Sequence, residues 1–149
     1  MNSKLIVIIA FLLLCAATSF AQNPDFIGTW VLNFEKSKLE DNSDALTKKV
    51  FVIQQKADQF KLTIKNSFGS REKSISFKMR PEGRTRRIKV LLKGNLEWKG
   101  NSLLASLWRK NFSNIVEYKF GNNQNELIAD EVFKGKNEGH HNIWVFERK

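Results

Sequence analysis

Cysteine, histidine and proline are scarce in this chain of 149 residues, which has one cysteine, two histidines and two prolines. The single cysteine, Cys15, cannot form a disulfide bond within the chain, and it excludes metal sites built from several cysteines. Long hydrophobic runs are also lacking, because the run from Leu5 to Cys15 has eleven residues whereas a membrane-spanning helix needs about 20. The sequence therefore predicts neither a disulfide framework nor an integral membrane body.

Basic charge and aromatic side chains are abundant instead. Lys and Arg number 25 against 15 Asp and Glu, which gives a formal net charge of +10, and the chain has 4 Trp, 1 Tyr and 12 Phe. A hydrophobic share of 42% is too high for an ordinary disordered chain, and the length suits one domain. The charge favours anionic partners without identifying them.

The first 21 residues have the pattern of a secretory signal peptide. A short leader with Lys4 precedes the apolar run, and Ser19 and Ala21 place small residues three and one before a cut. We expect cleavage after Ala21, which leaves a domain of residues 22–149 that is secreted or periplasmic and has no cysteine. Two alternatives are an uncleaved anchor and a lipoprotein with a lipid on Cys15, although Leu14 is large for the second.

The rest of the chain reads as short strands with period-two alternation, as in the segment from Phe60 to Lys65. Turn-forming clusters such as Pro81-Glu82-Gly83 and Asn111-Phe112-Ser113-Asn114 separate the strands. The predicted strands cover residues 26–34, 48–56, 60–66, 72–79, 85–92, 95–98, 103–110, 115–120, 126–133 and 141–148. This spacing predicts an all-β fold, a single up-and-down antiparallel barrel of about 8–10 strands with at most a short helical turn near residues 36–47.

The strand that begins at Phe26 carries a Gly-x-Trp motif, Gly28-Thr29-Trp30, and the chain ends in Trp144-Val145-Phe146-Glu147-Arg148. In this pairing the sequence resembles the calycin superfamily of lipocalins and fatty-acid-binding proteins, and in particular bacterial secreted lipocalin-like domains. The resemblance implies that Trp30 closes one end of the barrel and that Arg148 stacks across it. Gly28, Trp30 and Arg148 are thus expected to be structural residues.

One family feature is missing. Fatty-acid-binding proteins that resemble this chain carry an Arg-x-Tyr on the last strand that holds a ligand carboxylate, and the matching positions here are Trp144 and Phe146. A cavity in this barrel would therefore be aromatic and apolar. The candidate cavity residues are Trp108, Trp144, Phe146, Tyr118 and Lys119, of which Lys119 could also lie outside.

The basic charge is concentrated between Arg71 and Lys93, a segment with a net charge of +7. Its basic side chains are expected to form one face, which is predicted from Arg71, Lys73, Arg80, Arg84, Arg86, Arg87, Lys89 and Lys93. This face could dock to an anionic glycan, to lipid headgroups or to an acidic protein surface. The alternative is an ordinary solvated surface of the barrel. Intracellular nucleic acid is not expected, since exposed aromatics are not interleaved with the cations.

Catalytic and metal-binding patterns are not found. The neighbours His140 and His141 should point to opposite faces of a strand, as should Asp130 and Glu131, so neither pair converges on one site. We expect Asp130 and Glu131 to be solvated, and we predict no enzyme, no metal and no cofactor. The predicted function is non-catalytic binding of a small hydrophobic or amphipathic ligand inside the barrel. The alternative is a filled barrel that docks an anionic partner through the basic face.

Overall fold

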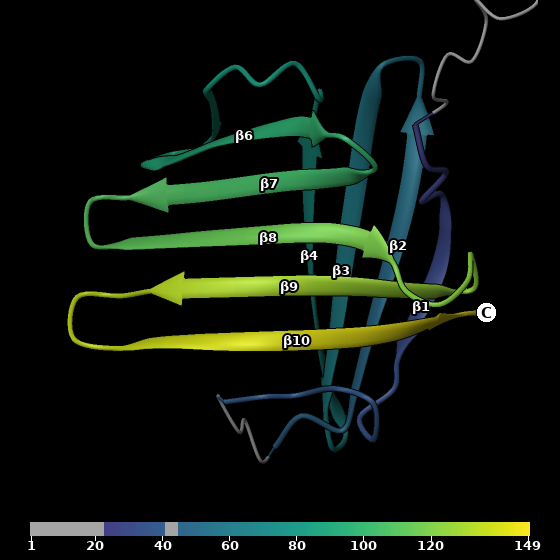
Figure 1. The fold of residues 1–149 in the computed structure, drawn as a ribbon. Helices are drawn as coiled ribbons and strands as arrows, with labels where there is room; N and C mark the ends of the chain where they lie inside the picture. The colour runs from purple at the N-terminus through teal and green to yellow at the C-terminus, as the bar shows by residue number, and fades with distance from the viewer. Residues whose placement is uncertain (1–22, 41–44) are drawn as a thin grey trace, which may run out of the picture.

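The structure is a computed structural model that describes residues 23–40 and 45–149, and its described part forms one sheet of ten antiparallel strands (Figure 1). Each strand pairs with its neighbours in the chain, except that β4 and β5 do not pair with each other, and β1 also pairs with β10. The strands are β1 (Gly28–Leu32), β2 (Lys48–Lys56), β3 (Gln59–Phe68), β4 (Arg71–Met79), β5 (Arg86–Lys89), β6 (Leu92–Lys99), β7 (Ser102–Arg109), β8 (Phe112–Phe120), β9 (Glu126–Lys134) and β10 (Gly139–Arg148). The predicted antiparallel up-and-down barrel is confirmed.

The barrel is nearly closed. Strands β4 and β5 are the two edges of the sheet and do not pair with each other, although Glu82 just after β4 forms an isolated bridge with Glu97 of β6. In Figure 1 the strands β1–β4 cross behind β6–β10 at a steep angle, so that the two groups form opposite walls. Side chains that point between these walls make the interior.

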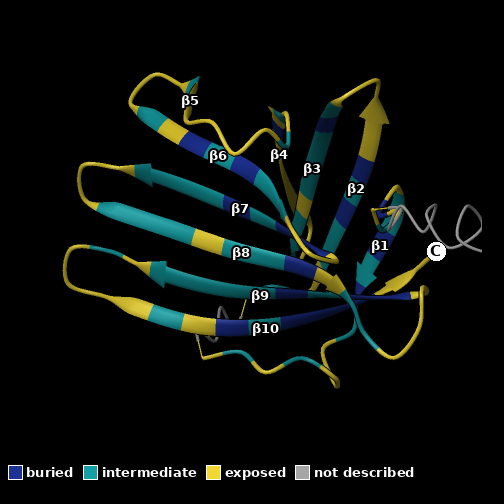
Figure 2. Cartoon of the chain, turned by 45° about the horizontal axis from the view of Figure 1, so that its top comes forward, coloured by how far each residue is buried: buried dark blue, intermediate teal, exposed yellow. Residues whose placement is uncertain are grey.

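Alternation along the strands decides which side chains point inward. Phe60 and Leu62 of β3 lie opposite Met79 and Phe77 of β4, and these four residues line interior space. The buried core also draws on β1, β2 and β6–β10, as the dark bands along the strands in Figure 2 show. The period-two pattern of the sequence therefore predicts the inner face of β3 and β4 correctly.

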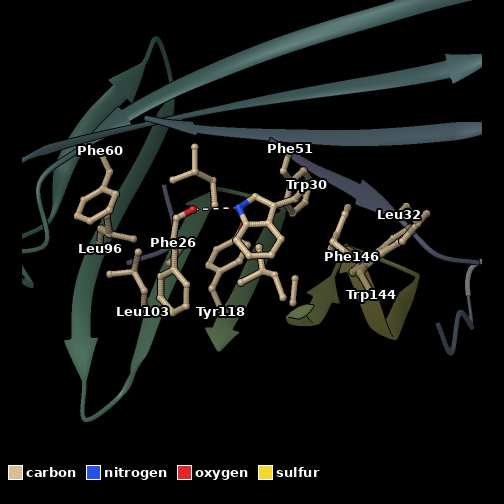
Figure 3. Packing of buried hydrophobic residues seen from close by; sticks show 14 residues of the cluster. Phe26, Trp30, Leu32, Phe51, Phe60, Leu96, Leu103, Tyr118, Trp144 and Phe146 are labelled. Atoms are coloured by element: carbon tan, nitrogen blue, oxygen red, sulfur yellow. Dashed lines mark hydrogen bonds between the residues drawn. The ribbon is translucent and has the colours of Figure 1, made fainter. Parts of the chain in front are cut away.

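An aromatic layer closes one end of the barrel. Trp30 is 0% exposed, and its indole Nε1 donates a hydrogen bond of 2.9 Å to the carbonyl oxygen of Phe26 (Figure 3). Arg148 lies over the Trp30 ring at 4.4 Å and donates to the carbonyl oxygen of Ile27. Gly28 has a φ of 149°, and a Cβ there would lie 3.2 Å from the Arg148 guanidinium. Gly28 thus makes room for this arginine side chain.

Two turns differ from the sequence prediction. The chain reverses at Val90 and Leu91, where the apolar pattern had suggested a continuous strand, and Gly94 lies inside β6. A Cβ on Gly94 would come within 2.7 Å of the Ser106 carbonyl oxygen on β7, so close packing explains this glycine. Phe112 belongs to β8 and shortens the predicted turn that begins at Asn111.

The segment near residues 36–47 contains no helix in its described part. Ser37 donates a backbone hydrogen bond to Phe34 in a turn, and Lys38 bridges to Ile143 of β10. Residues 41–44 of that segment, the predicted signal peptide and Cys15 lie outside the described residues. Within the described ranges no helix has the length and apolar character needed to span a membrane.

Candidate functional site

The barrel interior holds a cavity of about 200 Å³ between the two walls. Its lining comes from β2, β3 and β4 on one side and from β7, β8, β9 and β10 on the other. A second, apolar space of about 30 Å³ lies next to it, toward Phe26, and shares the lining residues Leu62, Phe77, Met79, Ala105 and Tyr118. The interior is thus partly open rather than filled with side chains.

Glu131 brings a carboxylate into this cavity. Its side chain is only 14% exposed, and it accepts hydrogen bonds from Trp144 Nε1 at 2.6 Å and from Asn114 Nδ2 at 2.8 Å. His140 Nε2 lies 4.0 Å from the same carboxylate. Since bonds to a charged acceptor are among the stronger hydrogen bonds in proteins, Glu131 holds Trp144 and Asn114 in place.

A cation lies over the ring of Trp144. The ammonium of Lys49 lies 3.5 Å from the centre of the Trp144 ring, a favourable cation–π geometry. Burial lowers the pKa of Lys49, and the negative charge of Glu131 opposes that shift. Burial likewise raises the pKa of Tyr118, and the charge of Glu131 adds to the effect. Tyr118 is therefore a neutral phenol at physiological pH.

Two amide oxygens complete the polar end of the cavity. Oδ1 of Asn66 and Oδ1 of Asn114 are buried and have no hydrogen-bond partner in the described part of the chain. Both residues line the cavity. We call Lys49, Asn66, Asn114, Glu131 and Trp144 the interior polar cluster. The cavity is thus polar at one end and apolar at the other, as an amphipathic ligand requires.

A larger hollow of about 1040 Å³ lies outside the opposite end of the barrel. It is lined mainly by polar residues, including Lys119 and Arg148, and Phe120 forms part of its floor. Phe120 packs on Phe26 and Trp30, with ring centres 4.8 and 6.1 Å apart. This aromatic layer separates the hollow from the interior cavity.

The five candidate cavity residues lie in different parts of the barrel: the interior cavity, the packed core, the outer hollow and the outer surface. Trp144 and Tyr118 line the cavity. Phe146 is fully buried in the core, where its ring stacks on Phe51 at 4.1 Å. Lys119 is exposed and borders the outer hollow. Trp108 follows the cavity residue Leu107, so alternation along β7 turns it to the outer surface.

Of the interior polar cluster, the sequence prediction named only Trp144 as a cavity residue. The expectation that Asp130 and Glu131 diverge is correct, because Asp130 contacts His141, at 2.7 Å, on the outer face. The expectation that both are solvated is wrong for Glu131. Alternation with Leu127 and Ala129, both fully buried, was the available signal that Glu131 points inward.

The predicted basic face is split between the two edges of the sheet. Arg71 and Lys73 lie on β4, whereas Arg86, Arg87 and Lys89 form most of β5, which does not pair with β4. Between the edges, Arg80 contacts Asp58 and Glu82, and Arg86 binds Glu82 at 2.7 Å. Arg84 lies in the loop before β5, and Lys93 lies on β6.

An outer groove of about 330 Å³ crosses the β5–β6 turn and the end of β7. Trp108 and Leu92 supply apolar surface there, and Arg87, Lys93, Arg109 and Lys110 supply positive charge. Leu91, which also lines the groove, is 81% exposed, and the preceding Val90 is 85% exposed. This groove therefore combines cations with apolar side chains.

Metal ligands do not converge anywhere in residues 23–40 and 45–149, where no group of three or more His, Cys, Asp or Glu side chains could hold an ion. His140 stacks on Phe133 on the sheet face that also carries Glu131 and Trp144, by alternation along β9 and β10, while His141 faces Asp130 on the other face. The two histidines thus point to opposite faces, as predicted.

Comparison with known proteins finds similarity only at the level of structure. No family model matches the sequence, and no curated protein matches it. Similar solved structures include the wild-type fluorescent protein UnaG (TM-score 0.56, 14% identity, 83% of this chain and 97% of that chain). Fatty-acid-binding protein 1 of Echinococcus granulosus matches with a TM-score of 0.57 and 16% identity, over 83% of this chain and 96% of that chain.

A third similar structure is the zebrafish ileal bile acid-binding protein complexed with cholic acid. It has a TM-score of 0.57 and 14% identity, and the match covers 83% of this chain and 98% of that chain. At these identities the comparison shows the fold alone. The described chain has a ten-stranded, nearly closed barrel fold like that of the fatty-acid-binding proteins.

Proposed function

We propose that this protein binds a small hydrophobic or amphipathic molecule, without catalysis, inside its barrel. The observation that carries the proposal is the interior cavity of about 200 Å³, apolar toward Phe26 and polar at Glu131. The fold supports the same function, since similar structures include a fatty-acid-binding and a bile acid-binding protein. A barrel filled with side chains would have favoured a purely surface-based function.

The size of the cavity limits the ligand. Sites for drug-sized molecules usually measure roughly 300–1,000 Å³, so about 200 Å³ suits a small molecule or one end of a longer amphiphile. Affinity would come mainly from apolar burial, at about 25 cal/mol per Å². The aromatic and aliphatic walls then set the shape, and the interior polar cluster orients the ligand.

Probe binding with a blocked cavity tests this proposal. N-phenyl-1-naphthylamine is uncharged and fluoresces more strongly in apolar surroundings, so its titration into the purified protein should give a saturable increase. Ala105 lines both interior spaces, and Ala105→Phe should abolish most of that increase. Ser106→Phe on the outer face of the same strand is the matched control. Equal probe binding by both variants would contradict binding inside the barrel.

The expected location belongs to the same proposal. A secreted or periplasmic protein would deliver or sequester its ligand outside the cytoplasm. The N-terminus of the protein purified from its own host tests this expectation, since cleavage after Ala21 predicts a chain that starts at Gln22. An intact Met1, or a lipid-modified Cys15, would replace this proposal with one of the alternatives.

A second candidate function is docking of the outer groove to an anionic lipid surface. The observation that favours it is the exposed pair Val90 and Leu91 beside the cations Arg87, Lys93 and Arg109. Leu91 has a φ of 65°, a conformation that is strained for a side chain of this size. An exposed leucine at a strained position is better explained by contact with a partner than by folding.

Vesicle sedimentation tests the second candidate. The protein should bind vesicles of phosphatidylcholine with phosphatidylglycerol, bind pure phosphatidylcholine weakly, and dissociate as salt is raised. Leu91→Asn should weaken this binding while leaving thermal stability equal or higher, because asparagine tolerates a positive φ. Arg87→Glu should also weaken it. Unchanged vesicle binding in both variants would reject the docking face.

A further inference from the structure

The interior polar cluster has an unusual balance of hydrogen-bonding groups. Each carboxylate oxygen of Glu131 already accepts one hydrogen bond, one from Asn114 Nδ2 and the other from Trp144 Nε1. Glu131 is therefore the structural centre of the cluster. The oxygens that accept no hydrogen bond at all, and so are left to meet a ligand, lie around it.

The bond to Glu131 also fixes the orientation of the Asn114 amide. Because Nδ2 donates to the carboxylate, Oδ1 must be the atom that points elsewhere, and it is buried without a partner in the described part of the chain. Asn66 Oδ1 is likewise buried and has no hydrogen-bond partner in the described part of the chain. A buried carbonyl left unpaired is destabilising, because it has lost its hydrogen bonds to water. Two acceptors in the cavity wall therefore need donors.

Lys49 supplies donors beside those acceptors. Lys49 and Asn66 are directly opposite in the β2–β3 ladder, so their side chains leave the sheet on the same face. The ammonium lies over the Trp144 ring, and no carboxylate of the described residues lies within 4.0 Å of it. The cluster thus offers both donors and acceptors to one bound group.

Charge favours an uncharged group. Lys49 and Glu131 both line the cavity and have opposite formal charges, so an uncharged head group leaves the cavity with no additional charge. A ligand carboxylate could accept from Lys49, but it has no proton to donate to Asn66 or Asn114, and it would add a second negative charge near Glu131. A head group with both an acceptor and a donor satisfies all three residues.

We propose that the interior polar cluster binds the uncharged head group of an amphiphile that carries a hydrogen-bond donor next to an acceptor, of which a primary amide is the simplest. The amide oxygen accepts from Lys49, and the amide N–H groups donate to Asn66 and Asn114. The apolar chain then extends along Tyr118 and Phe77 toward Phe26. This inference rests on the proposed function and names the class of ligand for that site.

Displacement of N-phenyl-1-naphthylamine by three ligands with the same chain tests the inference: dodecanamide, dodecanoic acid and methyl dodecanoate. The ester keeps the acceptor and lacks the donor. One hydrogen bond of about 1–1.5 kcal/mol corresponds to roughly 5–10-fold in affinity. We therefore expect dodecanamide to bind about tenfold more tightly than either the ester or the acid at neutral pH.

Three variants locate the effect. Asn66→Leu and Asn114→Leu remove one acceptor each and should abolish most of the advantage of the amide over the ester, while binding of the ester stays within about twofold. Asn95 also has a buried Oδ1 without a hydrogen-bond partner among the described residues, but it lies outside the lining of the cavity. Asn95→Leu is thus a matched control that should leave the advantage intact. Since Asn114→Leu also breaks a bond to Glu131, Asn66→Leu is the cleaner variant.

The outcomes separate the inference from the function on which it rests. Tighter binding of the acid than of the amide, or an amide advantage that survives in Asn66→Leu and Asn114→Leu, would overturn the proposed head group and leave ligand binding in the barrel intact. Failure of the probe and of all three ligands to bind would overturn both. Loss of the advantage in these two variants and not in Asn95→Leu would establish the site.

Discussion

Replacement of Glu131 by glutamine should destabilise the folded protein, because this carboxylate accepts hydrogen bonds from two neighbouring strands. Trp144 Nε1 lies 2.6 Å from one oxygen and Asn114 Nδ2 lies 2.8 Å from the other. Glutamine can accept only one of these bonds, and its NH2 group would face the second donor. The side chain is 14% exposed, so water replaces little of the loss.

The expected magnitude follows from the lost bond. A hydrogen bond to a charged group contributes about 1.5–3 kcal/mol, so Glu131→Gln should lower the free energy of unfolding by about that amount. For a domain of this size the midpoint of thermal unfolding should fall by roughly 5–15 °C. Urea unfolding at neutral pH and scanning calorimetry measure the two quantities.

The control makes the same chemical change on the surface. Glu72 is exposed on the edge strand β4, and Glu72→Gln should change stability by no more than about 0.5 kcal/mol. If Glu131→Gln were as stable as Glu72→Gln, Glu131 would not hold Trp144 and Asn114, and the reasoning about the cluster would fail.

Three further predictions concern the barrel itself. Gly94→Ala should cost about 1–3 kcal/mol by overpacking against β7, as urea unfolding would show, and an unchanged stability would contradict its place inside β6. Arg148→Met should cost about 1–2 kcal/mol through its lost contact with Trp30 and a lost hydrogen bond, and a Trp30→Phe background should reduce this cost in a double-mutant cycle. The pKa of Glu126 lies below its usual range, because the backbone N–H of Asn122 donates to its carboxylate and Lys36 binds it. Its contribution to folding stability is therefore present above about pH 4.5 and is lost as pH falls through the lower folded pKa. The urea midpoint should drop in acid, and it should drop less in Lys36→Met; identical pH profiles for the two proteins would oppose this assignment.

The strands and the barrel could be predicted from the sequence because alternation and turn residues are local signals. The inward row Phe60, Leu62 and Ile64 follows directly from the period of two. The same period places Glu131 on the same face of β9 as Ala129, but the charge of its carboxylate favoured a solvent-exposed position. Its partners Trp144 and Asn114 come from two other strands, and their approach depends on how the sheet curves.

The turn at Val90 and Leu91 could not be predicted for a different reason. Local chemistry favours a reversal at Gly94. In the structure Gly94 lies inside β6, where a Cβ would come within 2.7 Å of Leu107 and of the Ser106 carbonyl oxygen on β7. Leucine then occupies a position with a φ of 65° that glycine or asparagine would fill more easily. Exceptions to local rules of this kind are expected near functional surfaces.

Binding of a small molecule inside the barrel is the central claim, and native mass spectrometry of the protein purified from its own host tests it most directly. The claim predicts that gentle ionisation retains an additional mass, that denaturation releases it, and that Ala105→Phe loses it while Ser106→Phe keeps it. A protein that is empty and also fails to bind N-phenyl-1-naphthylamine would contradict the claim.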